Sequence, residues 1–83
     1  MVQYERLTPG SRTPWDAVIV TVRRALGRTV ADVAAVEQIA DFPMPVPRAL
    51  REAEAMQARL GLKRIAILIE DENLWQSEWG VLN

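Results

Sequence analysis

The segment from Arg64 to Glu70 reads RIAILIE, and it limits the folds open to this chain. Five apolar residues follow one another, so both faces of an extended segment are apolar, which is typical of a strand covered on both sides. A lone strand leaves its backbone N–H and C=O groups unpaired, so other strands must lie beside it. The sequence therefore predicts a small sheet centred on residues 64–70. Its candidate neighbours are residues 2–7, the tail after Asn73, or another chain.

The size of the chain sets a second limit. Its 83 residues suit one small globular domain spanning residues 1–83. The chain has no cysteine and no histidine, so disulfides and thiolate metal sites cannot stabilise it. Stability must come from a dense apolar core or from a second subunit. The polar N-terminal segment and the short apolar runs predict neither a signal peptide nor a membrane span. We expect a bacterial protein of the cytoplasm.

The segment 14–26 carries conflicting signals. Its larger apolar residues recur at helical spacing: Trp15, Val18, Ile19, Val22 and Leu26. The β-branched run from Val18 to Val22 favours a strand instead. Pro14 suits a first helical turn, and Gly27 suits a helix end. These end signals favour a helix over 14–26, which makes Trp15 a core residue.

Two further segments read as helices. Thr29 is a candidate cap for a helix over 30–41. Residues 47–60 place an apolar side against a charged one and end at Gly61, which predicts the clearest helix of the chain. The predicted fold is therefore α+β, with three helices packed on the small sheet centred on residues 64–70.

The tail after this sheet strand leaves two alternatives. Trp75, Ser77, Trp79 and Val81 alternate as in a strand returning along residues 64–70, whereas Trp75, Trp79 and Leu82 also share one helical face. Asn73 as a cap and Gly80 as a stop favour a short helix over 74–79. The preceding acids, Glu70 to Glu72, then mark the exit of a strand to water and the start of a helix.

The residue inventory argues against an enzyme. Without histidine or cysteine, the usual proton carrier and thiol nucleophile are missing. The consecutive carboxylates Glu70, Asp71 and Glu72 diverge along an extended chain, and no EF-hand spacing or glycine-rich phosphate loop is present. The sequence predicts no catalytic residue, no cofactor and no metal site.

Two kinds of macromolecular partner remain. The order of the expected elements is similar to that of a winged helix-turn-helix, with helix 47–60 in the DNA major groove and Arg48 and Arg51 as nucleic-acid contacts. All ten Lys and Arg residues lie at or before Arg64, where the chain carries +3, and the last nineteen residues carry −4. This asymmetry is either coincidental, or it provides a basic face for an acidic partner or for head-to-tail self-association.

The second kind of partner is another protein. Trp75 and Trp79 lie near the end of the chain, where few residues remain to cover them, and tryptophan is favoured at interfaces. They either close over the isoleucine strand or form a face for a partner or a dimer. We expect a small, non-enzymatic protein-interaction or regulatory module, acting on another protein or as a homodimer, with the winged-helix DNA binder as the alternative.

Overall fold

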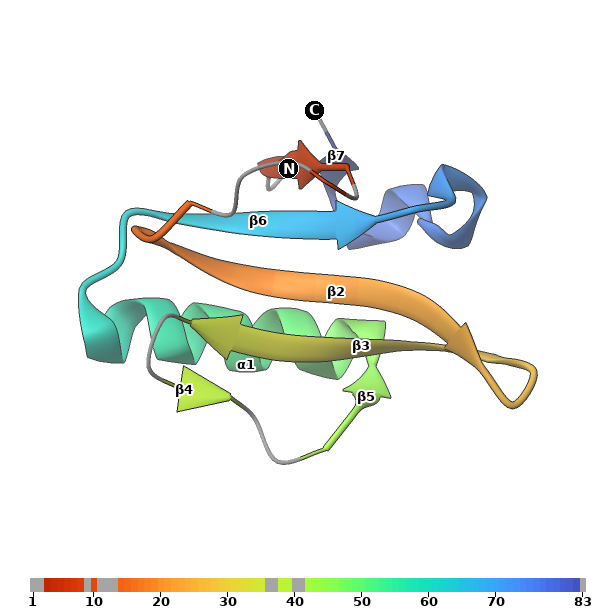
Figure 1. Ribbon diagram of the computed structural model, residues 1–83, viewed down its shortest axis with the longest axis horizontal. Coiled ribbons are helices and arrows are strands. Elements are labelled where there is room, and N and C mark those ends of the chain that lie inside the picture. The colour runs from red at the N-terminus through yellow and green to blue at the C-terminus, as the bar shows by residue number, and fades with distance from the viewer. Residues whose placement is uncertain (1–2, 9, 11–13, 36–37, 40–41, 83) are drawn as a thin grey trace.

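The computed structural model describes residues 3–8, 10, 14–35, 38–39 and 42–82. It shows a mixed β-sheet with one α-helix packed along one of its faces (Figure 1). The strands are β1 (Gln3–Leu7), β2 (Ala17–Ala25), β3 (Arg28–Ala35), β4 (Gln38–Ile39), β5 (Met44–Pro45), β6 (Arg64–Ile69) and β7 (Val81–Leu82). The helix is α1 (Val46–Leu60), and two short 3-10 helices follow β6: η1 (Glu72–Leu74) and η2 (Ser77–Trp79).

Strand β6 lies in the interior of the sheet, whose strand order is β4-β3-β2-β6-β1-β7, with β5 also paired to β3. It pairs in parallel with β1 on one side and with β2 on the other. Ile67 and Ile69 have no exposed surface, and Ala66 on the other face is equally buried. The prediction of an interior strand at 64–70, with residues 2–7 as a neighbour, is confirmed.

The prediction of three helices on a small sheet is wrong. Residues 17–25 form β2, and residues 28–35 form β3, where helices over 14–26 and 30–41 were expected. Residues 36–37 and 40–41 of the second expected helix lie outside the described residues. Within the β-branched run, residues Ile19 to Val22 pair with β6 and β3 at once, so backbone pairing on both sides outweighs the helical periodicity.

The turn between β2 and β3 shows why the helical end signals misled. Leu26 and Gly27 both have positive φ angles, 52° and 77°, and Ala25 pairs with Arg28 across them. This is the geometry of a two-residue hairpin turn, which needs left-handed backbone at both central positions. The glycine that was expected to end a helix therefore closes a hairpin.

Helix α1 confirms the third helical prediction. It spans Val46 to Leu60, with Pro47 in its first turn and Gly61 in the left-handed region at φ 67°. The Gly61 N–H donates to the Gln57 carbonyl, which satisfies one of the carbonyls left open at a helix end. The buried residues of α1 follow helical spacing: Val46, Ala49, Leu50, Ala53 and Met56.

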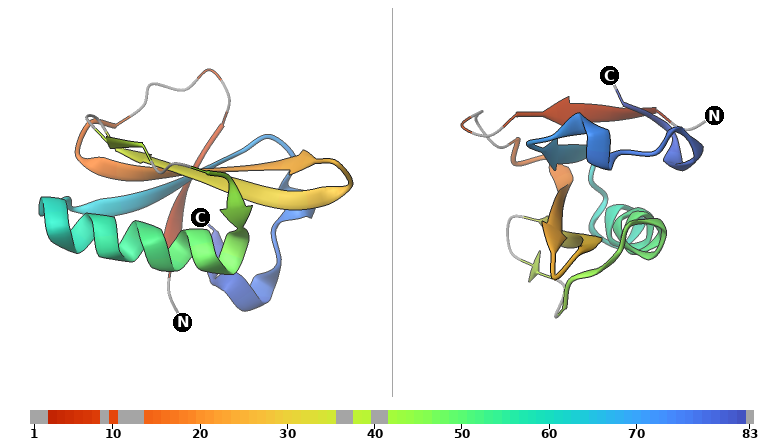
Figure 2. Two further views of the ribbon diagram at one scale, coloured as in Figure 1. Left: turned by 90° about the horizontal axis from the view of Figure 1, so that it is seen from below. Right: turned by 90° about the vertical axis from the view of Figure 1, so that its right-hand side faces the viewer.

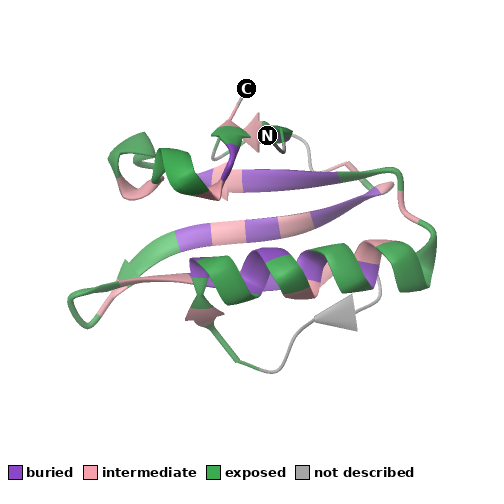
Figure 3. Cartoon of the chain, turned by 180° about the vertical axis from the view of Figure 1, so that it is seen from behind, coloured by how far each residue is buried: buried purple, intermediate pink, exposed green. Residues whose placement is uncertain are grey.

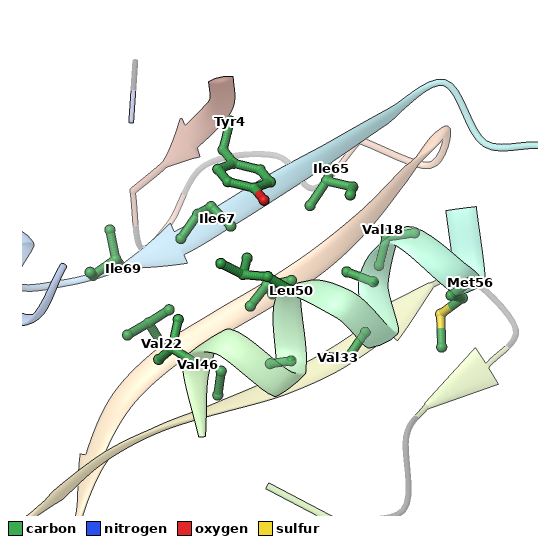
Figure 4. Packing of buried hydrophobic residues seen from close by; sticks show 14 residues of the cluster. Tyr4, Val18, Val22, Val33, Val46, Leu50, Met56, Ile65, Ile67 and Ile69 are labelled. Carbon is green, nitrogen blue, oxygen red and sulfur yellow. The ribbon is translucent and has the colours of Figure 1, made fainter. Parts of the chain in front are cut away.

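The two faces of the sheet differ in cover. We define the helix face by the β2 and β6 residues that join the core with α1: Val18, Val20, Val22, Ile65, Ile67 and Ile69. Figure 4 shows side chains of this face and of α1 pointing into one shared layer. We define the open face by the residues between them, which point away from α1: Ala17, Ile19, Thr21, Ala34, Ala66 and Leu68. In Figure 2, α1 covers one side of the sheet, and no described helix covers the other.

The tail closes the helix face at the β1 side of the sheet. The expected helix over 74–79 is wrong, because η1 and η2 are separate 3-10 turns. The alternative hairpin with residues 64–70 is wrong as well, since β7 pairs in parallel with β1 through Gln3 and Tyr4. Gly80 takes a φ of 135° between η2 and β7, a backbone angle that only glycine adopts at low cost. The chain therefore turns sharply and adds a strand at the edge instead of continuing as a helix.

Candidate functional site

The open face carries a shallow apolar hollow. The hollow has a volume of about 440 Å³. Its walls come from β2, β3, β6 and the segment before β2: Pro14, Trp15, Ala17, Ile19, Thr21, Ala34, Ala35 and Leu68. None of these residues is charged, and Thr21 is the one side chain in the sheet part of the wall with a hydrogen-bonding group. Such a lining favours contact with an apolar surface over recognition of a polar small molecule.

Trp15 lies at the edge of this hollow and is 78% exposed. The prediction that Trp15 belongs to the core is wrong, because it depended on a helix over 14–26 that does not form. Among the described residues, Trp15, Leu26 and Phe42 are the large apolar side chains that are more than half exposed. An indole with this exposure beside an apolar hollow is typical of a contact surface. Had residues 17–25 been read as a strand, Trp15 would have fallen in the loop before that strand, and its exposure could have been predicted.

Charged side chains close the open face at both ends. At one end, Arg64 donates to Glu5 (Nη1 to Oε2, 2.9 Å) and to Asp16 (Nη2 to Oδ1, 3.1 Å). At the other end, Arg23 donates to Asp32 (Nε to Oδ2, 2.8 Å) across the β2–β3 hairpin. These groups are partly exposed, so each pair contributes little to stability, but each lowers the net charge beside the hollow.

The predicted partner-binding residues Trp75 and Trp79 lie on the helix side of the sheet and not on the open face that carries the hollow. Both are half-buried and pack against the core. The Trp75 ring meets Tyr4 at 5.8 Å and Trp79 at 5.2 Å between centroids, both edge to face. The Trp75 indole N–H donates to the Gly80 carbonyl at 3.1 Å. They therefore cover the core within one chain, and a partner role for their remaining surface stays a prediction.

Arg48 and Arg51 lie on the exposed side of α1, and α1 covers the helix face (Figure 3). The described residues form a single α-helix, so the three-helix arrangement behind the winged-helix alternative is wrong. Contact of these two arginines with nucleic acid stays a prediction, but a winged-helix architecture no longer supports it. They lie on the opposite side of the sheet from Trp15 and the hollow.

The acidic run after β6 has structural roles for two of its three members. Asp71 caps η1 by accepting from the Asn73 backbone N–H at 3.0 Å, and Glu72 accepts from Arg6 Nη1 at 2.9 Å. Within the described ranges, no three His, Cys, Asp or Glu side chains gather as a metal site needs.

Comparison with known proteins does not assign the chain to a family. No protein-family model, curated protein or solved structure matches the chain. In the described part of the chain, no helix has the length and apolar character needed to span a membrane. The candidate site is therefore defined by its own geometry, an apolar hollow bordered by Trp15 and by two ion-paired ends.

Proposed function

We propose that this chain is a small, non-enzymatic protein-interaction module that docks a partner protein through the open face. The observation that carries the proposal is the position of Trp15, a largely exposed indole at the edge of an uncharged hollow. Tryptophan is among the residues whose truncation most often costs an interface a large share of its binding energy. Trp15 is therefore the expected anchor of the interaction.

The chemistry of the hollow supports binding over catalysis. The described residues of its lining carry no carboxylate, amine or guanidinium, so none of them is suited to proton transfer at neutral pH. Of the described charged groups at the ends of the face, Arg23 is paired with Asp32 and Arg64 with Asp16. A partner that presents an apolar, uncharged surface fits this lining without leaving a buried charge unpaired.

A selection experiment tests the proposal and does not require the partner to be identified. A random displayed-peptide library is selected against the chain, immobilised at low density so that single copies are presented. Enriched peptides are then titrated by calorimetry against the native chain and against Trp15→Ala. We expect Trp15→Ala to weaken binding by about tenfold or more.

A matched control places a change on the opposite side of the molecule. Arg51→Ala alters an exposed residue of α1 and should leave peptide affinity within about twofold. Peptides that bind the native chain and Trp15→Ala equally, or a library that yields no binder, would contradict the proposed function.

A further inference from the structure

We infer that residues 71–82 form a displaceable lid, and that the edge of β1 beside it is a docking site for a peptide with the lid's own contacts. The lid, defined as residues 71–82, contains η1, η2 and β7. Its apolar side chains pack on the helix side of the sheet. The inference therefore goes beyond the proposed function, which concerns the open face and Trp15.

Little backbone pairing joins the lid to the sheet. Strand β7 has two residues, Val81 and Leu82, and both pair with β1 at the edge of the sheet (Figure 1). Strands β2 and β6, by contrast, pair through six residues of each strand. Because backbone pairing raises the free energy of local opening, the contact between β1 and β7 is the easier one to break.

The side chains of the lid are buried less completely than those of the sheet. Those that meet the core are half-buried: Leu74, Trp75, Trp79 and Leu82. In β6, Ile67 and Ile69 have no exposed surface. Segments with few fully buried apolar side chains open at a lower free energy than the core. The lid is therefore expected to open before the sheet does.

The contact between the lid and Arg6 is incompletely packed. A hollow of about 550 Å³ lies there, lined by Arg6 and by lid residues between Glu72 and Leu82. Arg6 Nη1 donates to Glu72 Oε2 at 2.9 Å, but Arg6 Nε is buried without a hydrogen-bond partner. A buried donor without an acceptor is unfavourable, and opening of the lid lets water reach it. The closed lid therefore carries a cost that its opening removes.

The contacts of the lid show which chemistry the edge of β1 accepts. Glu72 places a carboxylate on Arg6. Trp75, three residues later, sets its ring edge to face against Tyr4, with 5.8 Å between the centroids. Strand β7 then adds main-chain pairing to β1. A peptide with a carboxylate three residues before a tryptophan, followed by a short strand, makes the same contacts once the lid is displaced.

The other charged groups beside β1 balance one another. Glu5 is paired with Arg64 at 2.9 Å. Glu54 and Lys63 carry opposite charges and line one hollow beside Tyr4. Neither pair adds net charge to the edge, so Arg6 is the cation that a carboxylate of the peptide meets. The partner is therefore defined by its tryptophan and one carboxylate at this spacing, and not by a high negative charge.

Hydrogen exchange tests whether the lid opens as a unit. The backbone N–H groups of Leu74, Trp75 and Trp79 each donate to a carbonyl within the lid at 3.0 Å, so they report its opening. Their exchange is followed by NMR at a series of low urea concentrations and corrected for intrinsic rates. We expect the three amides to share one free energy of opening and to exchange at least about tenfold faster than the amides of β6.

A core substitution far from the lid is the matched control. Val33 is fully buried in β3, and β2 and β6 lie between β3 and β1. Val33→Ala destabilises the closed state and the lid-open state equally, because it touches only the sheet and α1. It should speed exchange of the β6 amides about tenfold and leave the lid amides within about twofold. Equal acceleration of both sets would show that the lid opens only when the whole chain unfolds.

A labelled peptide tests the docking site. The probe has the sequence of residues 71–82 and is titrated by fluorescence anisotropy against the native chain and against the chain with Trp75→Ala. The weakened lid of this variant competes less, so the variant should bind the probe about tenfold or more tightly than the native chain does. A second probe that itself carries Trp75→Ala should bind the variant chain at least about tenfold more weakly.

A second variant keeps this test decisive. Circular dichroism checks that the chain with Trp75→Ala is folded. If it is not, Glu72→Gln weakens the lid through the Arg6 contact alone, and it should raise affinity for the probe about two- to threefold.

The outcomes decide each part of the inference separately from the proposed function. Lid amides that follow the β6 amides in Val33→Ala would overturn the lid. A probe that binds neither variant, or that binds equally well without its tryptophan, would overturn the docking site. Trp15→Ala should leave both lid exchange and probe binding within about twofold, since Trp15 borders the open face. A larger effect would contradict the separation of the two sites.

Discussion

At the scale of single residues, Tyr4 shows how cover from the tail changes the properties of a side chain. Its ring is 4% exposed and meets the edge of Trp75. Burial, reinforced by the negative charge of Glu54, raises the pKa of the Tyr4 hydroxyl above its ordinary value of 10.0. The neutral phenol is therefore the form that the folded state favours.

This shift predicts a loss of stability in alkaline solution. Above pH 10.0 the unfolded chain loses the Tyr4 proton first, so the unfolded state binds fewer protons and the free energy of unfolding falls as the pH rises. Tyr4 is the only tyrosine, so absorbance of the tyrosinate reports its titration directly. We expect a midpoint above 10.0 in the folded chain, and a lower one in Glu54→Gln. Tyr4→Phe should unfold with a weaker dependence on pH in this range; an unchanged slope would contradict this assignment.

At the scale of elements, the β2–β3 hairpin holds a strained residue at its tip. Leu26 has a φ of 52° and a fully exposed side chain, so no packing compensates for its left-handed backbone. Asparagine tolerates this conformation and is favoured before glycine in such turns. Leu26→Asn should therefore raise the free energy of unfolding by about 0.5–1 kcal/mol in urea denaturation.

Leu26→Ala is the matched control for this turn. It removes the same exposed side chain but keeps an ordinary L-residue at positive φ, so the free energy of unfolding should change by less than about 0.5 kcal/mol. Equal stabilisation by both variants would show that the exposed leucine, and not the backbone angle, is the unfavourable feature.

At the scale of the whole molecule, the three tryptophans divide between two surfaces. Trp75 and Trp79 cover the helix face together with α1, while Trp15 borders the open face. Trp75→Ala should lower the free energy of unfolding by about 2–4 kcal/mol, since it removes contacts with Tyr4 and Trp79. Trp15→Ala should change it by less than about 0.5 kcal/mol, because little of the ring is buried.

These two variants are compared by chemical denaturation at protein concentrations at which sedimentation shows a monomer. At such concentrations, only contacts within one chain contribute to the measured stability. A large loss of stability in Trp15→Ala would mean that this ring belongs to the fold of the monomer. The open face would then lose its proposed anchor.

What could be predicted from the sequence depended on how far apart the interacting residues are. Helix α1 follows from a local apolar pattern, a start signal at Pro47 and a stop signal at Gly61. Strand β6 follows from a run that is apolar on both faces. The segments 14–26 and 30–41 carried helical spacing, but pairing between β2, β3 and β6 joins residues up to some fifty positions apart. No local signal reports such a contact, so the β-branched run could not be weighed correctly.

The candidate site shows the same difference between what local sequence reports and what long-range contacts decide. The composition of the chain by itself determined that usual thiol and imidazole chemistry is missing, and its tryptophans indicated an interaction role. Only the tertiary structure decided which tryptophan is exposed, because the exposure of Trp15 depends on where β2 begins and on which sheet face α1 covers. Side-chain chemistry is a property of each residue in the sequence, whereas burial is a property of pairs of segments that meet only when the sheet has formed.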